Sequence, residues 1–289
     1  MTDLGFGFPP LAQVRAIVGR ALDEDVTWGD VTTDNSVPED QRSRAILLVK
    51  QEGVLCGGPV FAETLRMVSA AVTVELLIAD GARIKRGDVA ARVAGPTRAL
   101  LTGERTALNF VQRLSGIATA TATFVDRLHG LPTTLIDTRK TTPGLRILEK
   151  YAVRVGGGHN HRFNLSDGVL LKDNHLAALR QRGLDLAAAI RTVKQRIPHT
   201  MNVEVEVTSL DQIDAVLTGG ADIILLDNMS NAEMREAVRR IKGRARTECS
   251  GNVTLDTVRE RAETGVDLIS SGALTHSSRA LDLSLELEG

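Results

Sequence analysis

The sequence predicts an α/β protein whose second part forms a closed or nearly closed barrel of parallel strands. From residue 133 onward, short apolar runs alternate with amphipathic helices, which is typical of a parallel sheet with helical crossovers. The one glycine run, residues 156–158, follows a predicted helix instead of a strand, so it is not a dinucleotide-binding loop. Six strand–helix units without such a loop favour a barrel over a doubly wound sheet. The six apolar runs cover residues 134–136, 169–171, 203–207, 223–226, 247–249 and 268–269.

The first third of the chain has a different pattern, which predicts a small half-barrel or sandwich. Apolar residues at helical spacing predict a helix over residues 10–22, and the acidic, turn-rich residues 23–30 predict a loop. Strands joined by tight turns are expected at residues 46–49, 72–77, 83–85 and 89–93.

A long helical stretch over residues 102–129 separates these two parts. Ser115 and Gly116 in its middle predict a break between two helices, because glycine costs about 1 kcal/mol relative to alanine inside a helix. We therefore expect the domain boundary there. Further helices are expected near residues 143–155, 177–196, 209–218, 231–242 and 254–264.

Composition excludes several classes of partner. The net charge is −1, from 35 basic and 36 acidic residues, and aromatic residues make up only 3% of the chain, which argues against binding of nucleic acid or an anionic membrane. Cys56 and Cys249 have no metal-binding spacing and are expected to be free thiols in a reducing compartment. Residues 1–10 lack the basic and apolar regions of a signal peptide, and no stretch approaches the roughly 18 apolar residues of a membrane span. The expected location is therefore the cytoplasm.

Charged or small polar residues follow all six apolar runs or lie within them. In α/β barrels the active site lies at the carboxyl ends of the strands, so these residues are expected on one rim. The third run itself carries Glu204 and Glu206, which share a face because strands have a period of two. The polar segments are residues 137–140, 172–175, 227–228, 250–252 and 270–273, with residues 156–162 between the first two runs.

The cations of this rim predict a polyanionic ligand. Arg139, Lys140, His161, Arg162 and Lys172 are not neutralised by carboxylates of their own in the sequence, and guanidinium groups pair well with carboxylates and phosphates.

Carboxylates and small residues complete the pattern. Glu206 and Asp227, with Glu204 as a third candidate, suit a hard cation such as Mg²⁺, which prefers one or two carboxylates together with phosphate oxygens. The small-residue loops at 250–252 and 271–273 come before predicted helices, where backbone N–H groups favour phosphate.

Each residue also has a purely structural interpretation. Glu204 could be a core carboxylate paired with an arginine, and Asp227 could cap the following helix. His175 is expected to lie at the start of a helix and not to bind a ligand directly. Asp222 comes before its strand and is interpreted as structural. Since polar groups follow all six runs, one shared site explains them better than six independent causes.

Several motifs resemble those of one enzyme family, the nicotinate-nucleotide pyrophosphorylases (carboxylating), also called quinolinate phosphoribosyltransferases. The resemblance covers nearly the whole chain, from residues 21–25 (ALDED) to residues 272–276 (GALTH). Its most specific stretches are LTGERTALN (101–109), LSGIA (114–118), DTRKTTPGLR (137–146), KYAV (150–153), GGGHNHR (156–162), KDNH (172–175), EVEV (204–207), LDN (226–228) and SGNV (250–253).

The resemblance implies an incomplete, open α/β barrel over residues 116–275 and an N-terminal α/β sandwich domain formed by residues 1–115 with residues 276–289. It also implies a cytoplasmic homodimer or hexamer with shared active sites and no nucleic-acid or membrane partner. Arg105 would be donated across the interface; the structural alternative is an ion pair with Glu104 or a nearby acid.

The resemblance further implies the role of each site residue. Arg139, His161 and Arg162, with Thr138 among the substrate-binding residues, would bind the carboxylates of quinolinate together with Arg105 of the partner subunit. Lys140, Lys172, Glu206 and Asp227 would be catalytic: the lysines bridge quinolinate and the pyrophosphate of phosphoribosyl pyrophosphate, and the carboxylates hold ribose hydroxyls and Mg²⁺. The remaining contacts, to the 5′-phosphate, ribose and pyrophosphate, would come from Ser250, Gly251, Asn252, Ser271, Gly272, Ala273 and His276.

The implied reaction gives nicotinate mononucleotide, CO₂ and pyrophosphate, as in de novo NAD biosynthesis. Three alternatives stay open from the sequence: a related pyrophosphorylase-like protein of molybdenum transport, a Schiff-base lyase using Lys140 or Lys172, and a protein that only binds a phosphorylated ligand. The chain departs from the family pattern at residues 163–165, where Phe-Asn-Leu replaces Leu-Gly-Leu, and at Ser271, where valine is usual. Cys249 lies beside the predicted phosphate loop, at a position expected to vary.

Overall fold

The structure is a computed structural model of the 289-residue chain, and it describes residues 7–288. Residues 1–6 and residue 289 lie outside the described residues. The structure therefore describes only part of the amino-terminal segment that was predicted not to be a signal peptide, and it lacks the last residue of the predicted first domain. Contacts divide the chain into two compact units. Unit 1 comprises residues 7–122, 141–157 and 274–288, and unit 2 comprises residues 123–140 and 158–273. The predicted domain boundary near residue 115 stays a prediction, and the contacts assign residues 116–122 and 141–157 to unit 1.

Unit 1 is built on a four-stranded antiparallel sheet with the order β12-β1-β5-β3. Strand β1 (Arg42–Val49) pairs on both sides, so that Ala45 faces Val93 of β5 and Leu287 of β12. Ala45, Leu47 and Val49 are buried at alternate positions, which gives the sheet one apolar face. The strands are β1 (Arg42–Val49), β3 (Thr73–Leu76), β5 (Val89–Pro96) and β12 (Leu283–Leu287), with β2 (Gly53–Val54) and β4 (Arg83–Ile84) forming a separate small ladder.

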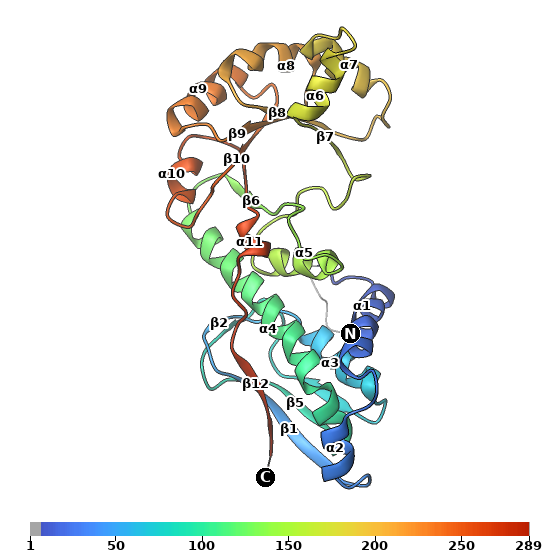
Figure 1. Cartoon of the computed structure of the whole chain (residues 1–289). Helices are drawn as coiled ribbons and strands as arrows, with labels where there is room; N and C mark the ends of the chain where they lie inside the picture. The colour runs from blue at the N-terminus through green and yellow to red at the C-terminus, as the bar shows by residue number, and fades with distance from the viewer. Residues whose placement is uncertain (1–6, 289) are drawn as a thin grey trace. The chain divides into compact units, whose positions relative to one another are not determined.

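Helices cover the apolar face of this sheet. Helices α3 and α4 lie against the sheet (Figure 1). Phe61 and Leu65 of α3, with Leu100 and Leu108 of α4, belong to the same buried cluster as the strand residues. This arrangement confirms the predicted α/β sandwich. The helices of the unit are α1 (Leu11–Asp25), α2 (Val31–Ser36), α3 (Gly58–Val68), α4 (Thr97–Arg127, whose end lies in unit 2), α5 (Arg146–Val155) and α11 (Ala273–His276, which begins in unit 2).

The predicted loop over residues 23–30 begins later than expected, because α1 continues through Asp25. The hydroxyl of Thr27 donates to the carbonyl of Asp23 at 2.9 Å and closes the last turn. The Asp25 carboxylate accepts a hydrogen bond from Thr106 at 3.1 Å, which ties the same turn to α4. One local and one long-range hydrogen bond thus hold a last helical turn that the acidic sequence did not predict.

The predicted break at Ser115 and Gly116 is wrong, since α4 runs unbroken through both residues. A Cβ atom on Gly116 would lie 2.0 Å from the carbonyl oxygen of Arg279, so the glycine lets another segment of unit 1 approach the helix backbone. Ser115 bonds the backbone of Cys56 in both directions, at 2.9 and 3.0 Å. Both residues serve packing instead of ending the helix.

Unit 2 contains a six-stranded parallel sheet with the order β6-β11-β10-β9-β8-β7. In the part of the chain that the structure describes, β6 and β7 are edge strands with no ladder between them, so the sheet is open. This confirms the incomplete barrel and excludes the closed form. The strands are β6 (Thr134–Ile136), β7 (Val169–Leu171), β8 (Val203–Val207), β9 (Ile223–Asp227), β10 (Arg246–Ser250) and β11 (Leu268–Ser270), which confirms all six predicted runs.

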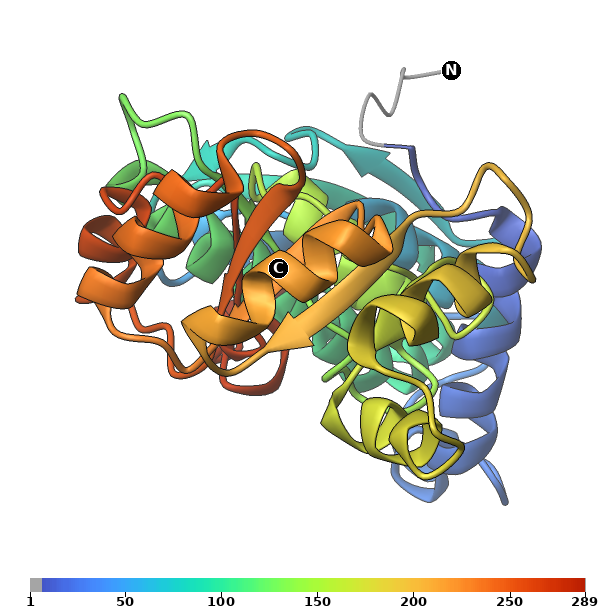
Figure 2. The same ribbon diagram turned by 90° about the horizontal axis from the view of Figure 1, so that it is seen from above.

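Helices connect these strands and lie on the outer side of the sheet (Figure 1). Figure 2 shows the helices of unit 2 from a second direction. The single helix predicted over residues 177–196 is two helices, because Gly183 adopts a left-handed conformation and Asp185 starts a new helix by accepting the N–H of Ala188 at 2.7 Å. The helical segments are α6 (Asp173–Arg180), α7 (Leu186–Lys194), η1 (Leu210–Gln212), α8 (Ile213–Gly219), α9 (Asn231–Ile241) and α10 (Val258–Ala262).

Two aspartates brace the amino ends of the strands. Asp222 accepts the N–H of Val203 at 2.7 Å and pairs with Lys194 at 2.8 Å, which confirms its structural interpretation. Asp267 accepts both the N–H and the hydroxyl of Thr247, at 2.7 and 2.8 Å. The carboxylates at the opposite ends of the strands are thus the ones available for chemistry.

Two further predictions were tested by the structure. Cys56 and Cys249 are free and buried, as expected. Within residues 7–288 no helix is both long and apolar enough to cross a membrane.

Replacing Gly116 with alanine should destabilise the protein, although alanine is the better helix former. The new methyl group would meet a backbone oxygen that cannot move aside, and overpacking of this kind costs about 1–3 kcal/mol. Gly19 of α1 is the matched control, because its added Cβ would lie 3.7 Å from the flexible end of Met67. Urea unfolding should show a loss for G116A and a gain of up to about 1 kcal/mol for G19A. Equal gains for both variants would contradict this account of α4.

Candidate active site

The carboxyl edge of the open sheet gathers most of the predicted site residues in unit 2. Thr138, Arg139 and Lys140 follow β6, Lys172 follows β7, and Asp227 ends β9. Since all six strands are parallel, their carboxyl ends lie at one edge. The other predicted residues of unit 2 are His161, Arg162, Glu206, Ser250, Gly251, Asn252, Ser271, Gly272 and Ala273, whereas Arg105 and His276 belong to unit 1.

The segment after Gly158 lies along the free edge of β6. Ile136 and His159 form a parallel bridge, and the N–H of Asp137 donates to the carbonyl of His159 at 3.0 Å. The Asp137 carboxylate is fully buried and accepts the N–H of His161 at 2.8 Å and the side-chain N–H of Asn160 at 2.7 Å. Asp137 therefore fixes the loop that carries Arg162. Asp137 begins the DTRK motif, but no sequence pattern indicated this anchoring role.

Arg139 and Arg162 of unit 2 lie near each other, and few acidic groups compensate their charges. Burial and the charge of Arg139 lower the pKa of Arg162, in that order of size, while the charge of Glu204 opposes the shift. Within residues 7–288 Arg139 makes no hydrogen bond or ion pair, and its Nε–H is buried without a partner. Arg162 donates to the carbonyl of Gly168 at 2.9 Å. Two neighbouring guanidinium groups with unused N–H donors have the charge and the donors that a dianion would need.

The two predicted catalytic lysines have different surroundings. The Nζ atom of Lys172 lies 3.3 Å from Oε2 of Glu206, and its side chain is half exposed. The N–H of Lys140 donates to the hydroxyl of Thr138 at 3.0 Å, so that Thr138 shapes the turn after β6. His175 accepts the N–H of Lys172 at 3.1 Å and caps α6, as its interpretation as a helix-start residue predicted.

The loops after β9 and β10 interlock. A Cβ atom on Gly251 would lie 2.1 Å from Oδ1 of Asn228, and Gly251 has a φ of 94°. The N–H of Asn228 donates to the carbonyl of Ser250 at 3.1 Å. Asp227 accepts a hydrogen bond from Asn228 at 2.8 Å, and Ser230 caps the next helix, so Asp227 is not that cap. The loop at 250–252 does not lead directly into a helix as predicted, since α10 begins only at Val258.

A buried acidic pair lies behind His161. Nε2 of His161 is 3.1 Å from Oε2 of Glu204 and 3.8 Å from Oε2 of Glu248, and the two glutamates are 4% and 1% exposed. Burial, followed by the negative charge of Glu204, raises the pKa of Glu248 to about 8. Glu204 is thus a core carboxylate, as one interpretation held, but its partner is a histidine and not an arginine. These three side chains also line a cavity of about 550 Å³ in unit 2.

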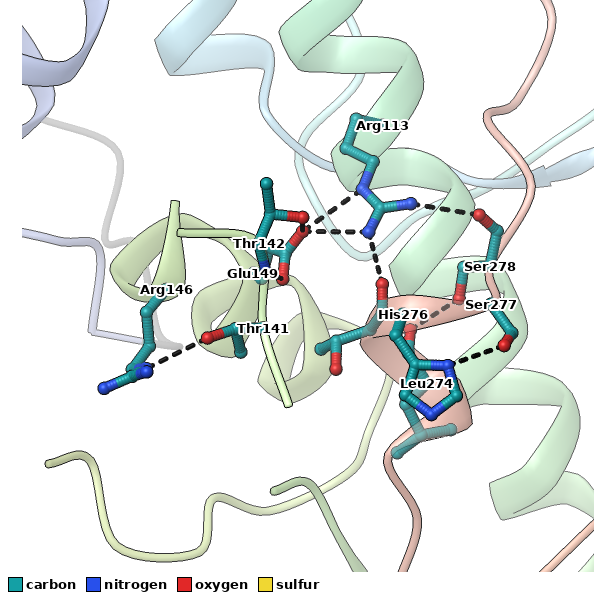
Figure 3. Close-up of polar contacts among 10 residues, drawn as sticks. Arg113, Thr141, Thr142, Arg146, Glu149, Leu274, His276, Ser277 and Ser278 are labelled. Atoms are coloured by element: carbon teal, nitrogen blue, oxygen red, sulfur yellow. Dashed lines mark hydrogen bonds and ion pairs between the residues drawn. The ribbon is translucent and has the colours of Figure 1, made fainter. Parts of the chain in front are cut away.

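In unit 1, Arg113 and Glu149 organise a second polar network (Figure 3). Arg113 pairs with the fully buried Glu149 at 2.9 Å and donates to the backbone carbonyls of Thr275 and Ser278. Glu149 also accepts the N–H and the hydroxyl of Thr142, at 3.0 and 2.8 Å. The network joins α4 to the TTPG segment and to the end of α11. Its members stand in the quoted motifs or beside them, but side-chain roles could not be assigned from the sequence.

Arg105 and His276 have few partners of their own. Arg105 is exposed on α4, between Thr102 and Thr106, which donate to Asp30 and Asp25 at 3.1 Å. Within the described residues it makes no ion pair with Glu104, contrary to the structural alternative. His276 is exposed, and its Nδ1 lies 2.7 Å from the hydroxyl of Ser277 (Figure 3).

The three departures from the family pattern leave the charged groups in place. The N–H of Phe163 donates to Asp167 at 2.7 Å and closes a short turn. Ser271 is buried, and its N–H donates to the carbonyl of Ile136 at 3.1 Å. Cys249 is buried, with its sulfur 3.7 Å from Nη1 of Arg261.

The stability of the protein should depend on pH through Glu248. Its pKa lies near the ordinary 4.5 when unfolded and at about 8 when folded, so the stabilisation is complete below 4.5 and is lost as pH rises toward 8. Glutamine cannot ionise and does not suffer this loss. The melting temperature of E248Q relative to the parent protein should therefore be higher at about pH 9 than at about pH 5. A difference that does not change with pH would show that Glu248 does not titrate in this range.

The chain is similar to known proteins over nearly its whole length. Family models described as quinolinate phosphoribosyl transferase, N-terminal domain and C-terminal domain, match residues 30–115 and 117–286. The chain is 43% identical to the nicotinate-nucleotide pyrophosphorylase [carboxylating] of Mycobacterium leprae, over 94% of this chain and 96% of that protein. It is 40% identical to a probable nicotinate-nucleotide pyrophosphorylase [carboxylating] of Bacillus subtilis, over 95% and 93% of the two chains.

Solved structures show the same similarity in three dimensions. NadC from Streptococcus pyogenes superposes with a TM-score of 0.91 at 42% identity, and the match covers 97% of each chain. Family models over both parts of the sequence, close relatives over nearly all of it and the matching structure lead to one conclusion: the chain belongs to the quinolinate phosphoribosyltransferase family.

Proposed function

We propose that this protein transfers the phosphoribosyl group of phosphoribosyl pyrophosphate to quinolinate and releases CO₂ and pyrophosphate. The observation that carries the proposal is the neighbouring pair of Arg139 and Arg162, of which Arg139 has a buried N–H without a partner. Quinolinate has two adjacent carboxylates on its ring, and two guanidinium groups match that geometry and charge. Thr138 belongs to the same proposed substrate-binding set. His161 would serve this set by holding Arg162, because its ring nitrogens face the N–H of Arg162 and the carboxyl group of Glu204.

The donor would bind on the lysine and carboxylate side of the rim. Lys140 and Lys172 lie at the carboxyl ends of β6 and β7, where they would attract the pyrophosphate as its charge develops. The interlocked loop of Ser250, Gly251 and Asn252 and the loop of Ser271, Gly272 and Ala273 offer the small residues that let a phosphate approach the backbone. His276 would reach the pyrophosphate from α11.

Glu206 and Asp227 fit a magnesium ion that arrives with the donor. Mg²⁺ keeps several waters and typically takes one or two carboxylates plus substrate phosphates, and these two carboxylates end adjacent parallel strands. When bound, the ion would neutralise charge on the leaving pyrophosphate. Lys172 already lies 3.3 Å from Glu206, so the lysine and the ion would share that carboxylate.

The chemistry follows from charge. The ring nitrogen of quinolinate forms a bond to C1 of the ribose as the bond from C1 to the pyrophosphate oxygen breaks, and its electron pair leaves with pyrophosphate. The ring nitrogen then carries a positive charge. The C–C bond to the 2-carboxylate breaks, CO₂ leaves, and the electron pair remains on the ring carbon, which takes up a proton to give nicotinate mononucleotide. The arginines hold the second carboxylate throughout.

The three alternatives fit less well. A Schiff-base mechanism needs a lysine that is removed from water, whereas Lys172 is half exposed and lies 3.3 Å from Glu206. A protein that only sequesters ligand would not need lysines and carboxylates at the position of the leaving group. The related proteins of molybdenum transport share the broad class, but the matched families and the named relatives are the quinolinate enzymes.

The proposal predicts turnover with a defined product. Incubation of the protein with quinolinate, phosphoribosyl pyrophosphate and Mg²⁺ should yield nicotinate mononucleotide, detected by chromatography and mass spectrometry, with one CO₂ per product. Nicotinate is the control acceptor, because it lacks the second carboxylate and should give little product. Binding of both substrates without product would reject the enzyme and favour the sequestering protein.

The active site should be shared between two copies of the chain, with Arg105 supplied by the partner. The exposed Arg105, without an ion pair in the described residues, is available for such a role. R105A and R139A should each be nearly inactive alone. After subunit exchange, a mixed dimer has one intact site, so an equal mixture should recover about a quarter of the parent activity.

The matched control for this experiment is R105A mixed with the double variant R105A/R139A. No arrangement of these subunits contains an intact site, so activity should stay at the background level. Absence of recovery in the first mixture, with subunit exchange verified by mass spectrometry, would place Arg105 in its own subunit's site and contradict the shared arrangement.

A further inference from the structure

The buried carboxyl pair behind His161 has no role in the reaction described above. Glu204 comes from β8 and Glu248 from β10, the strands on either side of β9, and both are almost completely buried. In each glutamate, Oε1 is buried without a hydrogen-bond partner in the described part of the chain, while Oε2 faces Nε2 of His161. Burial of a carboxyl group costs free energy unless the group is paired, hydrogen-bonded or protonated, so the neighbours of this pair need an explanation.

The hydrogen bonds of His161 decide what role this pair can have. Its Nδ1 accepts the backbone N–H of Arg162 at 2.6 Å, so Nδ1 carries a lone pair. In the neutral ring the proton is then on Nε2, from which it can be donated to Glu204 at 3.1 Å. One ring thus links the backbone of Arg162 to carboxyl groups on two strands of the sheet.

The same tautomer disfavours a metal site in this cluster. The nearest donor atoms of His161, Glu204 and Glu248 all lie within 4.8 Å of one another, which is close enough to hold an ion. A metal would need the lone pair of Nε2. The proton would then be on Nδ1, where it would face the N–H of Arg162 at 2.6 Å.

The geometry points to Glu204 and Glu248 as positioning residues for quinolinate binding, acting through His161 on Arg162. This inference rests on the proposed function. The loop of residues 159–162 is held on one side by Asp137, which bonds Asn160 and the N–H of His161, and on the other by the carboxyl pair through the imidazole ring. Between these two attachments, Arg162 is kept near Arg139 despite their mutual repulsion. Releasing the ring would let the two guanidinium groups separate.

Steady-state kinetics with each substrate varied separately tests the inference. E248L and E204L should each raise the KM for quinolinate about tenfold, because each removes a buried carboxyl group that faces the ring of His161, while the KM for phosphoribosyl pyrophosphate changes less than about twofold. E248Q, which keeps a polar group of the same size beside the ring, should restore a KM near that of the parent enzyme. E204L keeps the test informative if E248L does not fold.

A matched control separates positioning from stability. Glu63 of unit 1 is also buried and pairs with Arg15 at 2.6 Å, but it belongs to the N-terminal sandwich. E63L should lower the melting temperature without changing the KM for quinolinate. An increase of that KM in E63L equal to that in E248L would overturn the positioning role, as would unchanged quinolinate KM values in both E248L and E204L.

The tautomer itself can be measured without any activity. A ¹⁵N-labelled sample of the full chain should show the His161 ring with its proton on Nε2, and its signals should stay unchanged when Zn²⁺ is added. A proton on Nδ1, or signals of His161 that shift with Zn²⁺, would overturn the inference in favour of a metal site. Because this spectrum needs no substrate, it distinguishes failure of the inference from failure of the proposed enzymatic function, which the parent protein's turnover reports separately.

Discussion

The arrangement of the site depends on keeping two like charges close together without a ligand. Arg139 follows β6, and Arg162 lies on a loop that is anchored to the free edge of that strand. The buried Asp137 makes this possible, because its two carboxylate oxygens bond the loop at Asn160 and at the backbone of His161. In a partly desolvated setting, repulsion between two guanidinium groups is not well screened, and only an over-determined backbone can oppose it.

The open edge of the barrel makes this arrangement possible. A closed barrel would pair β6 with β7, and the backbone groups that now hold His159 would be used in a ladder. In the open sheet, the loop of residues 159–162 lies along the free edge of β6. This loop carries Arg162, which does not belong to any strand. Loops held by a rigid scaffold are common positions for binding groups. Here the scaffold also supplies the buried carboxyl groups that hold the loop from the inside.

Unit 1 contributes rigidity of a different kind. The fully buried Glu149 gathers Arg113 and Thr142, and Arg113 in turn binds the backbone around α11 (Figure 3). One ion pair therefore fixes three segments distant in sequence, including the TTPG stretch that directly follows Lys140. Removing either partner would leave a buried charge without compensation, which is more costly than the pair itself.

The sequence by itself determined the six strands, the α/β class and the residues at the strand ends, because strand periodicity and the common direction of parallel strands are local properties of the chain. It also determined the family, through motifs that cover both units. Only the tertiary structure decided that Gly116 stays inside a helix, that Asp137 and Glu248 support the rim, and that His161 turns toward two glutamates. These outcomes depend on contacts between residues far apart in sequence, and no local pattern of charge or hydrophobicity encodes which buried partner a side chain meets.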